Sequence, residues 1–184
     1  SLAAIPLATT AHGAITPVDV TFGTADSLYL DFDGGTFATT SQAGSDVKLN
    51  FEYGGSEKPY VQGLDAWEFA NSSGSFVQLF DIGATTTTSS TYTSGYIEYY
   101  SSGPGEGGFT NKAIAFTDGS NAAYALMSYD DAANQMTIHH FDYAAGQTTI
   151  QVGAIPEPAT SAALMALLAG GATVFQRSRK RANI

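Results

Sequence analysis

Two carboxylates that lie two residues apart occur in the stretch Asp31-Phe32-Asp33-Gly34-Gly35. Calcium prefers hard oxygen ligands, and the glycines that follow permit a sharp turn that gathers several oxygens around one ion. The twelve-residue calcium-loop pattern requires a ligand at its fifth position and Glu at its twelfth, where Gly35 and Gln42 stand. We therefore expect Asp31 and Asp33 to form either the polar end of a strand or a weak calcium site suited to millimolar extracellular calcium, and we expect no other cofactor.

Two adjacent histidines, His139 and His140, are followed by Asp142 and suggest a metal site. Neutral imidazole is a common metal ligand, and a carboxylate can complete or orient such a site. Successive side chains of a strand point to opposite faces, so a regular strand cannot direct both histidines to one ion. We expect one histidine to face the core or a partner strand and the other to face solvent. Asp130-Asp131 is a second, weaker calcium candidate.

Carboxylate pairs about 5–10 Å apart hydrolyse glycosidic bonds on many scaffolds. The candidates here are Glu52, Asp65, Glu68 and Glu98, and the ring of Trp67 could stack on a sugar or fill the core. Neither G-x-S-x-G nor H-E-x-x-H nor a phosphate-binding loop occurs, and no serine has a recognisable nucleophile context. We expect a protein without catalytic residues, and a secreted polysaccharide-active hydrolase is the alternative.

These residues belong to a body whose apolar pattern has a period of two. Val47, Leu49 and Phe51 alternate with polar neighbours, and Leu28, Leu30 and Phe32 repeat the pattern. Further strand-like runs, separated by turn-like stretches such as Asp118-Gly119, are Phe76–Phe80, Thr91–Tyr100, Ala113–Phe116, Ala122–Tyr129, Gln135–Tyr143 and Thr148–Val152. Short strands at this spacing, with 10 Tyr and 11 Phe, predict an all-β fold, an antiparallel sandwich of jelly-roll type over residues 15–153.

The charge of the chain is unevenly distributed. All 17 acidic residues lie at or before Glu157, where three lysines oppose them. An acidic body repels phosphate backbones, so nucleic acid is a poor partner, whereas divalent cations and an extracellular medium suit it. Cysteine is absent, which excludes disulfides and thiolate metal sites.

The C-terminal 30 residues have a different composition. Ala159 to Phe175 is an uncharged run that, as a helix, would rise roughly 26 Å against a hydrocarbon core of about 30 Å. The helix should begin at or after Pro158, because proline suits a first helical turn and not an interior. A cluster of cations follows the run and favours a cytoplasmic end: Arg177, Arg179, Lys180 and Arg181. We expect one transmembrane helix with the body outside; the alternative is an ordinary buried C-terminal helix.

The order of Pro156-Glu157-Pro158, apolar run and basic terminus resembles the PEP-CTERM sorting signal of bacteria that make exopolysaccharide. The body, in Leu28–Gly34 and from Phe116 to the tail, is more weakly similar to the strand-rich bodies of other proteins with this tail. The resemblance implies export, anchoring in the inner membrane, recognition of Pro156, Glu157 and Pro158 by a membrane-embedded exosortase, removal of the tail, and delivery to the cell surface or extracellular matrix.

The N-terminal 14 residues look like the last part of a secretory signal peptide, with cleavage between about Ala11 and Ala14. The alternative is an N-terminal arm of the folded protein. The expected organisation is therefore a signal remnant (1–14), a β-sandwich body (15–153) and a sorting tail (154–184). We expect an exported structural or carbohydrate-associating protein whose partners are an exosortase, the membrane and exopolysaccharide.

Overall fold

A computed structural model describes residues 15–52, 58–87, 90–97 and 103–153 of the chain. The chain divides into two units, Ser1–Ala154 and Ile155–Ile184, and all of the described residues belong to the first. The expected signal remnant, the Pro-Glu-Pro motif, the apolar run and the basic cluster all lie outside the described residues. Within the described ranges, the chain contains no helix with the length and apolar character needed to cross a bilayer.

The described part of the chain is all-β, as the alternation predicted. Its thirteen strands are β1 (Thr16–Phe22), β2 (Ser27–Asp31), β3 (Thr36–Ala38), β4 (Val47–Glu52), β5 (Lys58–Gly63), β6 (Glu68–Ser73), β7 (Phe76–Val77), β8 (Leu79–Phe80), β9 (Thr91–Tyr92), β10 (Ser94–Tyr96), β11 (Phe109–Thr117), β12 (Ala122–Asp130) and β13 (Gln135–Ala144). The runs at 122–129 and 135–143 are confirmed as β12 and β13. The run at Thr148–Val152 is not a strand, because it makes one isolated bridge, Thr85 to Gln151.

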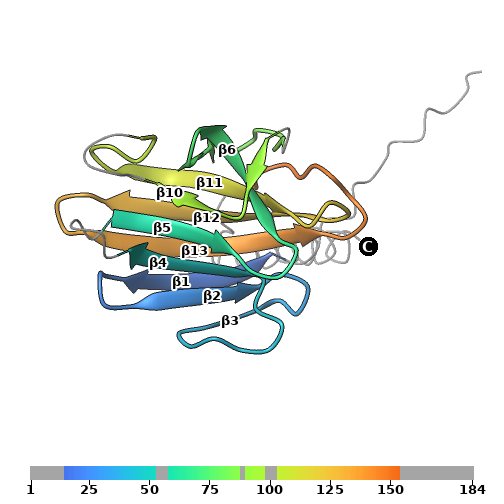
Figure 1. The fold of residues 1–184 in the computed structure, drawn as a ribbon, viewed down its shortest axis with the longest axis horizontal. Coiled ribbons are helices and arrows are strands. Elements are labelled where there is room, and N and C mark those ends of the chain that lie inside the picture. Colours follow the sequence, from blue (N-terminus) through green and yellow to red (C-terminus); the bar gives the residue numbers. More distant parts are fainter. Residues whose placement is uncertain (1–14, 53–57, 88–89, 98–102, 154–184) are drawn as a thin grey trace, which may run out of the picture. The chain divides into compact units, whose positions relative to one another are not determined.

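Eleven of these strands form one hydrogen-bonded path in the order β1-β13-β12-β11-β6-β7-β10-β5-β4-β2-β3 (Figure 1). The other two lie off this path, where β8 pairs with β11 and β9 pairs with β6. Strand β6 joins the two halves of the path, since Phe69 pairs with Phe116 of β11 while Asn71 pairs with Val77 of β7. One pair departs from the expected antiparallel arrangement: β10 runs parallel to β7, with Tyr96 opposite Phe76. The chain between these two strands is long enough for the crossover that a parallel pair needs.

The main core lies between the two halves of this path. The ring of Phe32, just after β2, lies 4.9 Å from Trp67, 5.2 Å from Phe116 of β11 and 5.5 Å from Phe141 of β13, measured between ring centroids. Aromatic rings at such distances pack closely and contribute beyond the apolar area that they bury. The two halves therefore share one interior, which fixes the loops at their ends.

Strand β12 is buried on both faces. Ala125 and Met127 belong to the core between the halves, whereas Tyr124 and Leu126 belong to a second cluster on the opposite face of the strand. That second cluster also contains Phe80, Ala84, Ile150 and Val152 from the segments beside β11 and after β13. The central strands of this half are accordingly the most enclosed part of the body.

Candidate functional site

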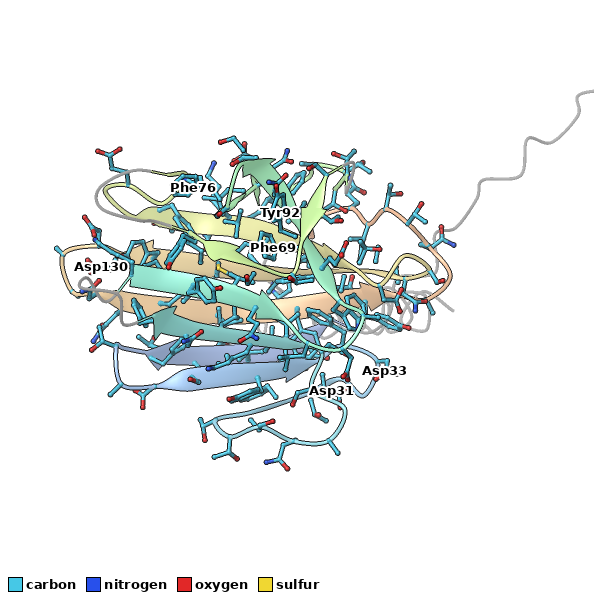
Figure 2. The ribbon with its side chains drawn as sticks, viewed as in Figure 1. Asp31, Asp33, Phe69, Phe76, Tyr92 and Asp130 are labelled. Carbon is cyan, nitrogen blue, oxygen red and sulfur yellow. The ribbon has the colours of Figure 1, made fainter. Side chains whose placement is uncertain are left out.

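Three aspartates gather where β2 ends and β4 begins. Carboxylate oxygens of Asp31, Asp33 and Asp46 all lie within 4.8 Å of one another, and we name these residues the acidic triad. Asp46 reaches the other two because β2 pairs with β4, with Leu30 opposite Val47, and the N–H of Asp46 donates to the carbonyl of Leu30 at 2.8 Å. Figure 2 shows Asp31 and Asp33 together, at the opposite end of the view from Asp130.

Backbone donors orient two of the three carboxylates. The N–H of Gly34 donates to Oδ1 of Asp31 at 2.7 Å, and the N–H of Phe32 donates to Oδ2 of Asp46 at 2.6 Å. A Cβ on Gly34 would lie 2.6 Å from Oδ1 of Asp31, so this position requires glycine if the carboxylate is to stay where it is. Glycine is therefore needed here because the backbone approaches the Asp31 carboxylate closely, in addition to the sharp turn that the sequence predicted.

Burial raises the pKa of Asp46 to about 6. The N–H of Phe32 opposes this shift, the negative charges of Asp33 and Asp31 add to it, and a bond from the Trp67 side chain opposes it again. Repulsion among neighbouring carboxylates favours binding of a proton or a cation. The chemistry of the triad is therefore that of a small hard-cation site, with oxygen ligands only.

The sequence indicated only two members of this site. Asp31 and Asp33 lie two residues apart and form a recognisable carboxylate pair. Asp46 follows 13 residues after Asp33, and nothing in its local sequence links it to that pair. The signal that could have found it is the strand pairing: the runs at 28–32 and 47–51 alternate in the same way, and antiparallel pairing between them sets Asp46 beside Asp31.

Trp67 lies in the core. Its exposed fraction is 6%, and its ring lies 4.9 Å from Phe32 and 6.3 Å from Tyr143. A sugar ring needs an open aromatic face, which this placement does not provide. The structure therefore favours the core alternative for Trp67 over the carbohydrate contact.

His140 is buried, as expected for one of the two histidines, whereas His139 is half-buried and does not simply face solvent. Nε2 of His139 lies 2.8 Å from Oγ of Ser128, and Nε2 of His140 lies 3.1 Å from the hydroxyl of Tyr124. A register irregularity between β12 and β13 occurs at this point. Burial, and then the charge of His139, lower the pKa of His140 to about 4, so the His140 ring is neutral.

Glu68 shares a hollow of about 460 Å³ with Asp118 and the hydroxyls of Thr91 and Thr148. Glu68 accepts a hydrogen bond from Thr91, and Asp118 accepts bonds from the N–H groups of Ser120 at 2.8 Å and Asn121 at 2.7 Å. Desolvation raises the pKa of Asp118, but these donors outweigh it and the pKa is lowered. Of the other expected carboxylates, Asp65 does not line this hollow, and Glu98 and the Glu52 side chain lie outside the described residues.

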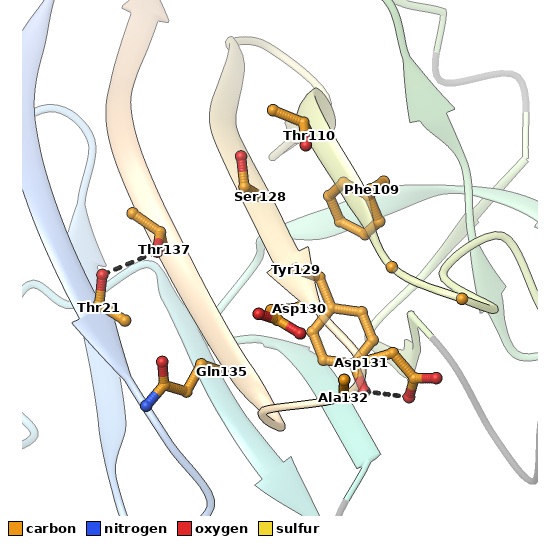
Figure 3. A pocket seen from close by; sticks show the side chains of 12 residues that line it. Thr21, Phe109, Thr110, Ser128, Tyr129, Asp130, Asp131, Ala132, Gln135 and Thr137 are labelled. Atoms are coloured by element: carbon orange, nitrogen blue, oxygen red, sulfur yellow. Dashed lines mark hydrogen bonds between the residues drawn. The ribbon is translucent and has the colours of Figure 1, made fainter.

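A larger depression, of about 650 Å³, lies at the end of the body where β12 turns into β13 (Figure 3). We name it the polar groove. Its lining residues are Thr21, Gly107, Gly108, Phe109, Thr110, Ser128, Tyr129, Asp130, Asp131, Ala132, Gln135 and Thr137. The sequence did not indicate this site, because its residues come from four strands and two loops.

The second calcium candidate lies in this groove, but its two carboxylates have separate partners. Oδ1 of Asp130 accepts a bond from the N–H of Ala133 at 3.0 Å. Oδ1 of Asp131 pairs with Nζ of Lys58 at 3.1 Å and accepts a bond from the Tyr129 hydroxyl at 3.1 Å. Asp130 therefore holds the turn between β12 and β13, and Asp131 forms an ion pair with Lys58.

No family model, curated protein or solved structure matches this chain.

Proposed function

We propose that this chain is an exported bacterial protein of the cell surface or exopolysaccharide matrix, which a membrane-embedded exosortase sorts through its C-terminal tail. The observation that carries the proposal is the order of Pro156-Glu157-Pro158, an apolar run from Ala159 to Phe175, and the basic cluster from Arg177 to Arg181. Proline flanking Glu157 keeps this short segment out of a regular helix, which suits an extended recognition element.

The end of the body supports the same reading. Val152 is buried, and the N–H of Gly153 donates to the Tyr124 hydroxyl at 2.9 Å, so the packed body extends to within three residues of Pro156. In this proposal the apolar run holds the chain in the inner membrane with the basic cluster on the cytoplasmic side. Cleavage at the motif then releases a body that is already complete.

The body serves a structural or carbohydrate-associating role in this proposal, without catalysis. We infer a jelly-roll-like sandwich, in which the half from β2 to β5 packs on the half from β11 to β13. The interior that the two halves share, with Phe32 in contact with Phe116 and Phe141, supports this finer description. The acidic surface suits a hydrated extracellular medium.

A weak calcium site at the acidic triad completes the proposal. Calcium there would join the loop after β2 to the residue before β4, and it would offset the repulsion that raises the pKa of Asp46. Extracellular modules bind calcium with dissociation constants of about 0.1–1 mM, which extracellular concentrations reach.

A secreted polysaccharide hydrolase is the second candidate, because Glu68 and Asp118 line one hollow. In that mechanism the ionised Asp118 would act as base or nucleophile and Glu68 as the acid. Asp118 already holds the turn at Ser120 and Asn121, which favours a structural role. Release of reducing sugar by the wild-type chain, and its loss in Glu68→Gln, would favour the enzyme.

Mass spectrometry of the mature protein taken from the cell surface tests the main proposal. The expected masses correspond to an N-terminus near residue 14 or 15 and to a C-terminus at or close to the Pro-Glu-Pro motif. A surface protein that retains residues 159–184 would overturn the sorting proposal.

A further inference from the structure

The polar groove presents one hydroxyl from each of four neighbouring strands (Figure 3). Thr21 of β1 pairs with Thr137 of β13, which pairs with Ser128 of β12, and Thr110 lies on β11, the next strand. Neighbouring strands are about 4.8 Å apart, so these hydroxyls form a row across the sheet. The row is a repeating polar surface and has no deep, enclosed end.

Part of the hydrogen-bonding capacity of the groove is unused, although Oγ of Ser128 already lies 2.8 Å from Nε2 of His139 and accepts a bond from the N–H of Asn111 at 3.1 Å. Thr21 and Thr137 share one hydrogen bond, of 2.8 Å between their Oγ1 atoms, and two hydroxyls can make several more. The side chains of Thr110 and Gln135 have no hydrogen-bond partner in the described part of the chain. Gln135 is exposed and offers both a donor and an acceptor. The groove can therefore serve a ligand that carries many donors and acceptors.

An aromatic ring lies at the side of this polar surface. Phe109 is half-buried, and its ring lies 6.2 Å from that of Tyr129, whose hydroxyl is already bonded to Asp131 and Asn134. The Phe109 ring therefore offers an apolar contact at the lining. Gly108, the residue before Phe109, lets the loop pack closely on β12, because it has a positive φ and a Cβ on it would lie 2.7 Å from the carbonyl oxygen of Tyr129.

The charge of the residues that line the groove favours uncharged ligands over anionic ones. Among the described residues that line the groove there is no lysine, arginine or histidine, whereas Asp130 and Asp131 are both present. Asp131 is paired with Nζ of Lys58, so the charge that a ligand meets is mainly that of Asp130. Asp130 is exposed and accepts a bond through only one of its two oxygens. An anionic chain would be repelled, while an uncharged hydroxyl can donate to the free oxygen.

A row of hydroxyls, an amide, a carboxylate acceptor and an apolar ring together match the chemistry of a pyranose, which has hydroxyls at its rim and C–H groups on its faces. We propose that the polar groove binds a neutral polysaccharide chain that lies across strands β1, β13, β12 and β11. This inference rests on the proposed function, since it names the partner of a matrix protein. In this proposal Phe109, and not Trp67 as the sequence suggested, is the aromatic residue that contacts the sugar.

Affinity electrophoresis of the purified full-length chain in non-ionic detergent tests the inference. Separate native gels contain mixed-linkage β-glucan, mannan, dextran or alginate, the last as an anionic control. At least one neutral polymer is expected to retard the wild-type chain, and alginate is not. The double variant Thr110→Val, Gln135→Ala should bind about four- to hundredfold more weakly, since each of the two lost hydrogen bonds to a neutral partner costs about two- to tenfold.

Gln62→Ala is the matched control, because Gln62 is an exposed amide on β5, in the other half of the body. It should bind as the wild type does. No retardation by any of the three neutral polymers, stronger retardation by alginate, or an equal loss in Gln62→Ala would each overturn the inference. Unchanged melting temperatures in both variants separate lost contacts from lost folding.

The two proposals fail separately. A chain whose tail is not removed but whose Thr110→Val, Gln135→Ala variant loses glucan binding would overturn the sorting proposal and keep the groove. A correctly processed surface protein that binds no neutral polymer would overturn the groove alone.

Discussion

The hydroxyl of Tyr124 accepts a hydrogen bond from the backbone N–H of Gly153 at 2.9 Å, at a site where the Tyr124 side chain is fully buried. The single phenol proton is then directed to Nε2 of His140, 3.1 Å away, which agrees with a neutral His140 ring. A Cβ on Gly153 would lie 3.6 Å from Cδ1 of Ile15. The last described residue, Gly153, therefore lies beside the first, Ile15, and is held there by the Tyr124 hydroxyl.

Tyr124→Phe is expected to lower the free energy of unfolding by about 1–2 kcal/mol, because it leaves the Gly153 N–H and the His140 Nε2 without their partner. Urea denaturation of the full chain measures this. Tyr60→Phe is the matched control: Tyr60 packs against Tyr96 at 4.9 Å between ring centroids and makes no side-chain hydrogen bond in the described part of the chain. Equal losses in the two variants would contradict a role for the Tyr124 hydroxyl.

Asp46 should make the body less stable as the pH rises from about 4 to about 6. Its pKa is raised from 3.8 to about 6, so in this window the folded chain binds the proton more tightly than the unfolded chain does. Asp46→Asn removes this term, and we expect it to stabilise the body at pH 7 by about 1–2 kcal/mol, since the carboxyl is partly solvated. Asn retains an oxygen for the Phe32 N–H. A stability–pH profile with the wild-type slope would contradict the assignment.

His140 should act in the opposite direction. Its pKa is lowered from 6.5 to about 4, so the stability that it contributes is complete above pH 6.5 and is lost as the pH falls toward 4. The groups that act on it are His139, Asp19 and the Tyr124 hydroxyl. His140→Gln keeps an acceptor for the Tyr124 hydroxyl and does not titrate.

Denaturation at several pH values tests the contribution of His140 to stability separately from that of Asp46. The wild-type profile should be nearly flat between pH 4 and 6.5, because the Asp46 and His140 terms offset each other. Asp46→Asn should show stability that rises with pH, and His140→Gln stability that falls. If His140→Gln leaves the profile unchanged, the ring is not the buried neutral group described above.

Calcium at 10 mM is expected to raise the melting temperature of the chain by about 3–5 °C, since a ligand with a dissociation constant near 1 mM stabilises the native state by about 1.4 kcal/mol. The double variant Asp31→Asn, Asp33→Asn should lose the shift. The Asp130→Asn, Asp131→Asn variant is the control and should retain it, because those carboxylates serve the turn and Lys58. An equal shift in the triad variant would exclude calcium binding at the triad.

Strands can be predicted well from the sequence where the same apolar pattern continues over several residues. Strands β4, β12 and β13 can be predicted because their alternation or apolar content is continuous. Strand β1 cannot, because Asp19 adopts a φ of 47° and the register with β13 shifts between Pro17 and Val20, so the period of two is broken. Local pattern therefore gives the all-β class but not every strand.

Sites that depend on distant segments were only partly predictable. Asp31 and Asp33 are adjacent in the pattern, but Asp46 joins them through the pairing of β2 with β4. The polar groove draws Thr21 and Thr137 from segments 116 residues apart, and no local spacing marks them. Trp67 has acidic neighbours in the sequence but points into the core, which only the tertiary packing decides.

Changing Glu157 to Ala should leave the body folded, exported and membrane-associated, but should block removal of the tail. Proline fixes its own φ and disfavours the helical region for the residue before it, so under the sorting proposal we expect Ile155 and Glu157 to be extended beside the membrane, where a cleaving enzyme would reach them. Glu157 lies beyond Gly153, the last described residue of the packed body, and before the apolar run, so the substitution removes a recognition group and no folding contact of the described body.

The measurement is the mass of the surface-exposed protein, with wild type and Glu157→Ala expressed in a host that has a matching exosortase. Glu106→Ala is the control, because Glu106 is an exposed acidic residue in the loop before β11 and should be processed as the wild type is. Loss of Ala159–Ile184 from the wild type and from the control, together with its retention in Glu157→Ala, would identify Glu157 as a residue that the enzyme reads. If the wild-type chain keeps these residues, the tail acts as a plain membrane anchor and the sorting proposal is wrong. If the Glu157 variant loses them as completely as the wild type does, the enzyme does not recognise the tail through Glu157, because a signal that tolerates loss of its central charge is not being read through it.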